Sequence, residues 1–146
     1  VKIFEEGCAC TLGKGIVLRE GRDVTIAASG IMTAEALDAA ELLRADGIDA
    51  EVLNFHTVKP FDEALLIASA GKTGAVVSAE NHSILNGLGG AVAECLSENR
   101  PVPLRRVGVR DHFGEVGLTE FLKEKYGLTV KDIAAAARSA VAAKKG

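Results

Sequence analysis

Residues 24–55 read VTIAASGIMTAEALDAAELLRADGIDAEVLNF and decide the fold. Residues 24–28 form a continuous β-prone run, which is typical of a strand buried on both faces. Residues 33–46 carry small and apolar side chains at i, i+4 and i+7, which predicts a helix that stops at Gly47. Residues 51–55 are β-prone again. The stretch therefore predicts a β-α-β unit with parallel strands.

The same alternation of short apolar runs and amphipathic runs continues on both sides of this unit. A tight turn at residues 20–23 joins the first strand to the second, so we expect the first strand to be antiparallel to the others. Alternating strands and helices predict an α/β fold with helices on both faces of the sheet. The further elements expected are strands at 16–18, 75–79 and 104–109, helices at 62–70, 88–98 and 119–126, and a last helix opened by the capping box Thr129-x-x-Asp132.

Length and composition indicate one globular domain. The chain has 146 residues, and we expect residues 1–15 to be a lead-in or linker and residues 16–146 to form the domain. The 17 basic and 20 acidic residues give no basic surface of the kind that nucleic acid requires. No stretch approaches the roughly 20 apolar residues of a membrane span. The predicted partners are therefore neither nucleic acid nor membrane.

The cysteines Cys8, Cys10 and Cys95 are odd in number and lack the spacing of a disulfide framework or a zinc site. We predict a reduced, cytoplasmic protein without a metal site, in which Cys95 is a core residue. The chain opens at Val1 without an initiator Met, which indicates a separated or excised part of a larger protein.

Polar residues gather after the predicted strands. His56, His82 and His112 each follow a strand end, with Glu80 and Asp111 beside them. In an open parallel sheet the carboxyl ends of the strands are where ligands and partners bind. We predict that these residues share a rim that faces a partner or a substrate channel, rather than forming a metal triad.

The loop that follows residue 79 contains Gly87-x-Gly89-Gly90 at the start of a predicted helix. A phosphate-binding loop would use such glycines, but the dinucleotide and P-loop patterns are incomplete here. We favour the alternative that the glycines let the helix lie close to the sheet or to another subunit. Glu80 and His82 could form an acid–base pair, although nothing in the sequence places a substrate between them.

Four motifs in order resemble the transketolase C-terminal domain family: residues 19–32, 47–62, 80–94 and 108–117. The likeness extends from about Gly13 to the end of the chain. It is closest to the C-terminal half of split transketolases. The same domain is shared more distantly by 1-deoxyxylulose-5-phosphate synthase and by the β subunit of 2-oxoacid dehydrogenase E1.

The resemblance implies a three-layer α/β/α fold with a five-stranded mixed sheet whose first strand is antiparallel. It implies that the complete enzyme uses thiamine diphosphate and magnesium to transfer a two-carbon ketol unit between sugar phosphates. The Gly-Asp-Gly…Asn cofactor motif and the activating Glu of other family domains are missing from the sequence. The domain is thus expected to bind no cofactor, to hold no catalytic residue and to be inactive alone.

The resemblance also implies how the domain is used. It is expected to support a homodimer, to contact the other transketolase domains or an N-terminal subunit, and to border the substrate channel. The family strand order places one set of residues around a single crevice: Ser29, Gly30, Glu80, Asn81 and His82. The remaining alternative is a regulatory module that binds a nucleotide or sugar phosphate at Gly30 and Gly87–Gly90.

Overall fold

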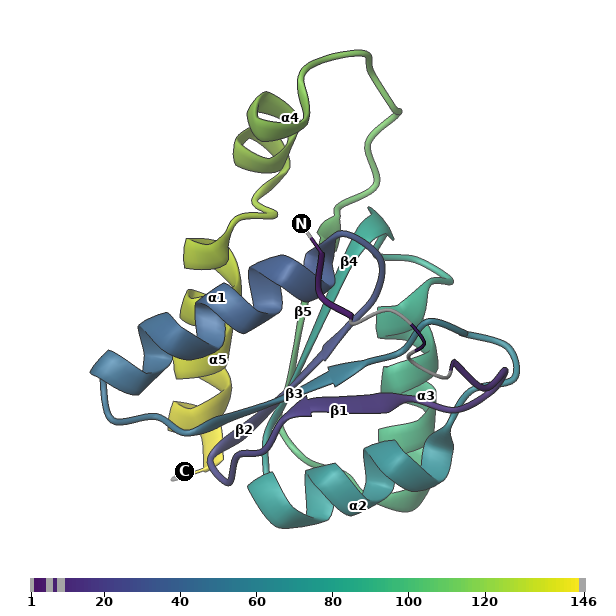
Figure 1. Cartoon of the computed structure of the whole chain (residues 1–146), viewed down its shortest axis with the longest axis vertical. Helices are drawn as coiled ribbons and strands as arrows, with labels where there is room; N and C mark the ends of the chain where they lie inside the picture. Colours follow the sequence, from purple (N-terminus) through teal and green to yellow (C-terminus); the bar gives the residue numbers. More distant parts are fainter. Residues whose placement is uncertain (1, 5–6, 8–9, 145–146) are drawn as a thin grey trace.

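The computed structural model describes residues 2–4, 7 and 10–144. Its centre is one five-stranded sheet of order β1-β3-β2-β4-β5 (Figure 1). β1 runs antiparallel to β3, and every other neighbouring pair is parallel. The predicted mixed sheet with an antiparallel first strand is confirmed. The strands are β1 (Ile16–Arg19), β2 (Val24–Ala28), β3 (Ala50–Asn54), β4 (Val76–Ser83) and β5 (Leu104–Val109).

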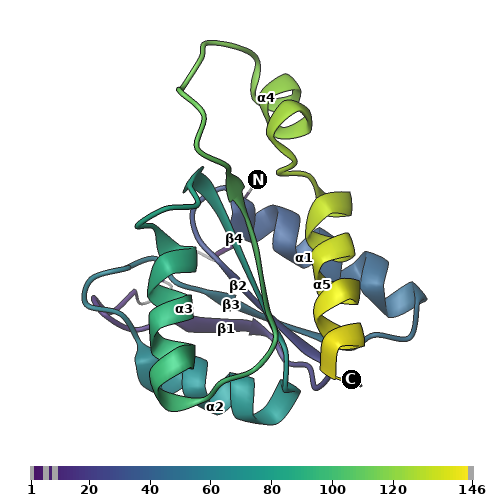
Figure 2. The same ribbon diagram turned by 180° about the vertical axis from the view of Figure 1, so that it is seen from behind.

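Helices cover both faces of the sheet and complete the predicted three layers. α1 and α5 pack on one face and α2 and α3 on the other, as the two opposite views show (Figures 1 and 2). α4 lies apart, beyond the strand ends. The helices are α1 (Met32–Ala45), α2 (Glu63–Thr73), α3 (Leu88–Asn99), α4 (Thr119–Tyr126) and α5 (Val130–Lys144).

Small side chains bring the outer helices close to the sheet. α1 buries Ala36, Ala39 and Ala40 completely, and α5 buries Ala137 and Ala140 completely. Alanine leaves the helix backbone free to approach its neighbours, so α1 and α5 contact each other as well as the strands. β2 is buried at every position, in agreement with its central place in the sheet.

Two predicted boundaries are wrong in an informative way. α2 does not end at Ala70 but continues to Thr73, and Gly74 follows it in the left-handed conformation at φ 71°. The extra turn is stabilised because Thr73 on it bonds the buried Thr25 of β2. β4 does not end at Ala79 but runs on to Ser83, so it carries the predicted rim residues within the strand itself.

The last part of the lead-in is fastened to the loop before α2. Gly13 N–H donates to Thr57 Oγ1 and Gly15 N–H donates to Asp62 Oδ2, both at 3.0 Å. Asp62 also caps α2, since its Oδ1 accepts from Leu65 N–H at 3.3 Å. Cys8 lies outside the described residues. Among the residues that are described, no helix is both long and apolar enough to cross a membrane.

Candidate functional site

The chain reverses its direction of growth across the sheet at β2. It passes from β2 through α1 to β3 on one side, then returns through α2 to β4 on the other side. Ala28 and Ala79 are partners in register, and Ser29 N–H donates to Ala79 O at 3.2 Å. The strand ends of β2 and β4 therefore form the topological switch point, where open α/β sheets bind their ligands.

The five predicted crevice residues do lie together at this switch point. Ser29 and Gly30 directly follow β2, while Glu80, Asn81 and His82 occupy the end of β4. A Cβ placed on Gly30 would lie 3.2 Å from Asn81 Oδ1, so the two segments are in close contact. Ser29, Glu80 and His82 also line one hollow of about 300 Å³.

Glu80 is the buried centre of this site. Only 2% of the residue is exposed, and its Oε2 and Oε1 accept from the N–H groups of Leu88 and Gly89, each at 2.8 Å. These are the first amides of α3, which have no partner inside the helix. A negative charge there is also favoured by the helix dipole. Glu80 thus caps α3 from the neighbouring strand.

The glycines at the start of α3 allow this contact. A Cβ on Gly87 would overlap the Glu80 carboxylate, and a Cβ on Gly89 would lie 2.8 Å from Ser78 Oγ. The prediction of close helix–sheet packing is confirmed at these two positions. The phosphate-loop alternative is wrong here, because the amides that would bind a phosphate already bind the carboxylate of Glu80.

His82 and Glu80 do not form a proton-transfer pair. Nδ1 of His82 lies 3.9 Å from Glu80 Oε2 and instead bonds Ser83 O at 2.8 Å. A carbonyl only accepts, so this Nδ1 carries the proton. Both Glu80 oxygens are engaged by backbone amides, which leaves His82, 65% exposed at its side chain, as a surface group.

The other three rim residues do not join the crevice. His56 is exposed after β3, on the opposite side of β2 from β4. Asp111 and His112 follow β5 in an exposed loop, where the His112 ring lies 5.9 Å from the ring of Tyr126. Within the described ranges, no group of three His, Cys, Asp or Glu side chains could hold a metal ion.

A buried polar cluster at the other end of the sheet escaped the sequence analysis. Ser69 Oγ donates to Oε1 of Glu51, a β3 residue that is 2% exposed, and Thr25 Oγ1 bonds Ser69 Oγ at 2.6 Å. The Lys72 ammonium pairs with Glu51 Oε2 and with Glu20 at 2.6 Å. The hydrogen bonds to Glu20 and Glu51 raise the pKa of Lys72. Glu51 itself could have indicated this cluster in the sequence, because an acidic residue within an otherwise apolar strand requires a buried partner.

The sequence also did not predict the position of residues 111–126, a segment that we call the arm. Every residue from 111 to 120 is exposed, and the loop with α4 projects beyond the strand ends (Figures 1 and 2). Lys123 ties the arm to α1 through Glu35 at 2.7 Å. Hydrogen bonds to Glu120 and Glu35 raise the pKa of Lys123. The helical period predicts α4 but not the loop's projection.

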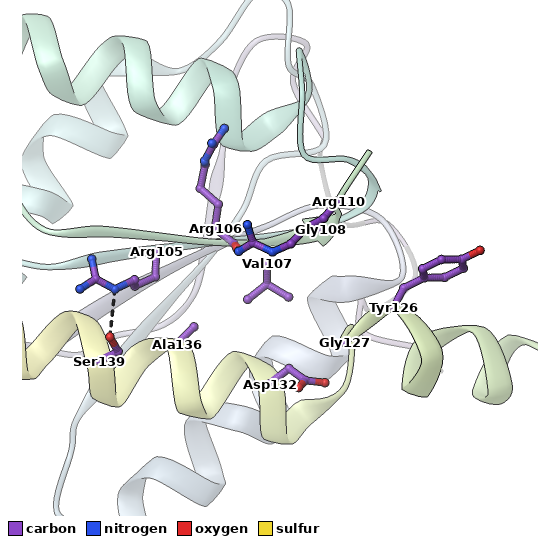
Figure 3. Close-up of a pocket in the computed structure, with 10 residues that line it drawn as sticks. All are labelled: Arg105, Arg106, Val107, Gly108, Arg110, Tyr126, Gly127, Asp132, Ala136 and Ser139. Carbon is purple, nitrogen blue, oxygen red and sulfur yellow. Dashed lines mark hydrogen bonds between the residues drawn. The ribbon is translucent and has the colours of Figure 1, made fainter. Parts of the chain in front are cut away.

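A second hollow, of about 360 Å³, lies beside the edge strand β5 (Figure 3). Arg105 Nε donates to Ser139 Oγ of α5 at 2.9 Å, and Arg110 folds back to donate to Arg106 O at 3.2 Å. Charged side chains along an exposed strand edge discourage pairing with another strand. We therefore interpret these arginines as protection of the sheet edge.

Comparison with known proteins gives consistent results. A family profile described as "Transketolase, C-terminal domain" matches residues 13–133. The chain is 68% identical over 137 residues to the 6-deoxy-6-sulfo-D-fructose transketolase subunit SqwH of Clostridium sp. (strain MSTE9), covering 94% of this chain and 42% of that protein. It is 42% identical over 139 residues to the 1-deoxy-D-xylulose-5-phosphate synthase of Heliobacterium modesticaldum, covering 94% of this chain and 22% of that protein.

Solved structures agree with the fold. A split gene transketolase, described as an inactive β4 tetramer, superposes with a TM-score of 0.95 at 51% identity, covering 99% of this chain and 47% of that one. The transketolase from Leishmania mexicana superposes with a TM-score of 0.66 at 20% identity, covering 89% of this chain and 18% of that one, which shows a shared fold alone. The chain thus spans less than half the length of each of these relatives.

Proposed function

The chain belongs to the transketolase C-terminal domain family, and we propose that it is the C-terminal assembly domain of a thiamine diphosphate-dependent transketolase. The complete enzyme transfers a two-carbon ketol unit between sugars. The observation that carries this proposal is the 68% identity to a transketolase subunit over 94% of the chain. The TM-score of 0.95 to a split gene transketolase supports the same parent.

A parent enzyme whose two halves are separate polypeptides accounts best for the fraction of each transketolase relative that this chain matches. The two relatives named a transketolase subunit and a split gene transketolase are matched over 42% and 47% of their own chains. We therefore propose that this domain works with a further part of its own subunit and with an N-terminal subunit. The second candidate is 1-deoxyxylulose-5-phosphate synthase, which the 42% identity to such a synthase supports.

The cofactor is proposed to bind in other domains. A diphosphate group needs free amides or cations, and the start of α3 is the feature of the crevice that would otherwise offer amides. Glu80 already accepts from the amides of Leu88 and Gly89, and its negative charge would repel a diphosphate. The crevice residues therefore do not fit the cofactor, and we assign them a role that faces a partner or the substrate channel.

The donor sugar is proposed to be a ketose that ends in an anionic group. Sugar phosphates are the substrates expected from the family resemblance, whereas the 68% identical relative is named for a sulfosugar. Phosphate and sulfonate share a tetrahedral, negatively charged oxygen shell, so both belong in the donor panel.

The proposed location is the cytoplasm, which the free thiols of Cys10 and Cys95 support.

Ketol transfer tests the proposal. The complete enzyme and this chain alone are each assayed with thiamine diphosphate, magnesium, an aldose phosphate acceptor and one of three donors: a ketose phosphate, 6-deoxy-6-sulfo-D-fructose or pyruvate. We expect turnover by the complete enzyme with at least one donor and none by this chain alone. Turnover by the chain alone, or condensation of pyruvate with an aldose phosphate by the complete enzyme in place of ketol transfer, would contradict the proposal.

A further inference from the structure

The lead-in lies along the carboxyl ends of the parallel strands (Figure 1). Near its start, Ile3 lines a hollow of about 330 Å³ together with Gly30, which follows β2, and Ala34 of α1. At its end, the chain enters β1 at Ile16, which pairs with Asn54, the last residue of β3. The described parts of the lead-in therefore lie at the same rim of the sheet as the crevice residues.

Two main-chain hydrogen bonds fasten the lead-in just before β1. Gly13 N–H donates to Thr57 Oγ1 and Gly15 N–H donates to Asp62 Oδ2, each at 3.0 Å. We call these four residues the clasp. Asp62 is only 8% exposed, and a carboxylate accepts more strongly than a neutral oxygen. Because both donors belong to the main chain, the clasp fixes the path of the lead-in itself.

The two glycines of the clasp serve close contact rather than flexibility. Gly13 has a φ of +77°, and a Cβ placed on it would lie 2.8 Å from Pro60 Cγ. A Cβ on Gly15 would lie 2.6 Å from Leu65 Cδ2 and 3.0 Å from Phe55 Cε1. The glycines of a flexible linker are surrounded by solvent, whereas these let the main chain lie directly on residues 55–65. The end of the lead-in is therefore packed as a part of the domain.

We propose that Thr57 and Asp62 are positioning residues of the complete enzyme. Through the clasp they hold the lead-in in one path, so that the further part of the subunit meets the strand-end rim in one orientation. This inference rests on the proposed function, in which the domain is C-terminal and the lead-in connects it to that further part. A connection that is already ordered loses less conformational entropy when the parts assemble.

Trypsin measures whether the clasp holds the lead-in. The side chain of Lys14, inside the clasp, is 67% exposed, but a protease can cut only when the surrounding main chain is released from the domain. The rate of cleavage between Lys14 and Gly15 therefore reports the fraction of molecules in which the clasp is open. In the whole chain, we expect the double variant Thr57→Val/Asp62→Asn to be cut there about tenfold faster than the wild type, because it weakens both hydrogen bonds.

The matched control is Thr57→Ser/Glu63→Gln. Serine keeps the hydroxyl that accepts from Gly13, and Glu63 is an exposed acid beside the clasp, so the control alters the same region while both bonds stay in place. It should be cut at the wild-type rate. Asparagine at position 62 keeps an oxygen that can cap α2, so thermal unfolding of the test variant should stay close to that of the wild type. Should the double variant fail to fold, Thr57→Val alone repeats the test with the same expected direction.

Sedimentation velocity of the complete enzyme measures whether the clasp orients its parts. An assembly that requires one orientation forms in proportion to the fraction of molecules that already have it. We therefore expect the apparent dissociation constant of the assembly to rise about threefold or more in the double variant. The matched control should keep the wild-type dissociation constant.

Equal cleavage of the double variant and the wild type would overturn the inference, because the clasp would then not hold the lead-in. Assembly of the double variant with the wild-type dissociation constant, despite its faster cleavage, would overturn it as well. Ketol transfer by the complete wild-type enzyme is measured separately. Its absence would count against the proposed function, while the comparisons of cleavage and assembly would still decide the role of the clasp.

Discussion

Glu80 shows how one side chain can change the meaning of a motif. The sequence places it beside a glycine-rich turn and a histidine, a combination compatible with phosphate binding or with acid–base catalysis. In the structure its two oxygens each accept an N–H group from the start of α3, and the residue is 2% exposed. A carboxylate that completes a helix in this way is a structural group, and it excludes a ligand anion from the same amides.

We therefore predict that Glu80→Gln lowers the free energy of unfolding by about 2 kcal/mol, because the amide replaces a charge-assisted acceptor with a neutral one. Urea unfolding followed by circular dichroism measures the change. Glu98→Gln is the control at an exposed position of α3, the helix that Glu80 caps, with an expected change within about 0.5 kcal/mol. Equal effects of the two substitutions would show that the cap contributes nothing beyond surface charge.

The buried Glu51 makes a second prediction at this scale. Lys72→Met leaves the Glu51 carboxylate buried without its cation, which is strongly destabilising for a fully buried pair. Since the Lys72 side chain is 43% exposed, we expect a smaller loss of about 2 kcal/mol in urea unfolding. Combining it with Glu51→Gln should restore part of that loss. A double variant less stable than Lys72→Met would contradict the pairing.

At the scale of elements, the hydrophobic period and the cap residues could be read directly from the sequence. β2, β5 and α4 begin and end as predicted, and the capping box at α5 forms: Thr129 N–H donates to Asp132 Oδ2 at 3.0 Å and Asp132 N–H donates to Thr129 Oγ1 at 3.4 Å. The ends of α2 and β4 could not be predicted, because contacts between distant segments decide them. The side chain of Thr73 bonds β2, and Ser83 of β4 pairs with Val109 of β5 after a register shift that follows Ala79.

The glycines of α3 offer a matched pair of substitutions. Gly89→Ala would bring a Cβ to 2.8 Å from Ser78 Oγ and 3.0 Å from Glu80 Oε1, so we predict a loss of about 1–3 kcal/mol in unfolding free energy. Gly90→Ala meets no atom of the described chain within 4 Å, and should gain up to about 1 kcal/mol from helix propensity. Urea unfolding of both variants ranks them. The reverse order would contradict the close approach of α3 to β4.

The stability that Lys123 provides by anchoring the arm on α1 should depend on pH. Its pKa is raised above the ordinary value of 10.5 by hydrogen bonds to Glu120 and Glu35. Since the folded state holds this proton more tightly, the contribution is complete below pH 10.5 and is lost as the pH rises through the raised value. Urea unfolding at pH 9 and at a pH above 10.5 should therefore show a smaller alkaline loss of stability in Lys123→Met than in the wild type. Equal losses would mean that Lys123 does not anchor the arm.

At the scale of the whole molecule, the alternation of strands and helices predicts the layers, and the family resemblance supplies the strand order. Ser29 and Glu80 are far apart in sequence and meet only because the chain crosses from β3 over β2 to β4. The exclusion of His56 from that meeting follows from the same crossing. The arm could not be predicted, because a helical period shows which face is apolar but not whether anything lies against it.

Our central proposal is that this domain serves assembly and that the rest of the enzyme carries the cofactor chemistry. The most direct test removes residues 13–146 from the complete enzyme and measures the assembly by sedimentation velocity, with circular dichroism to verify that the remainder is folded. We expect that the folded remainder no longer forms the complete assembly and has lost ketol transfer. A folded remainder that keeps both its assembly and its ketol transfer would contradict it.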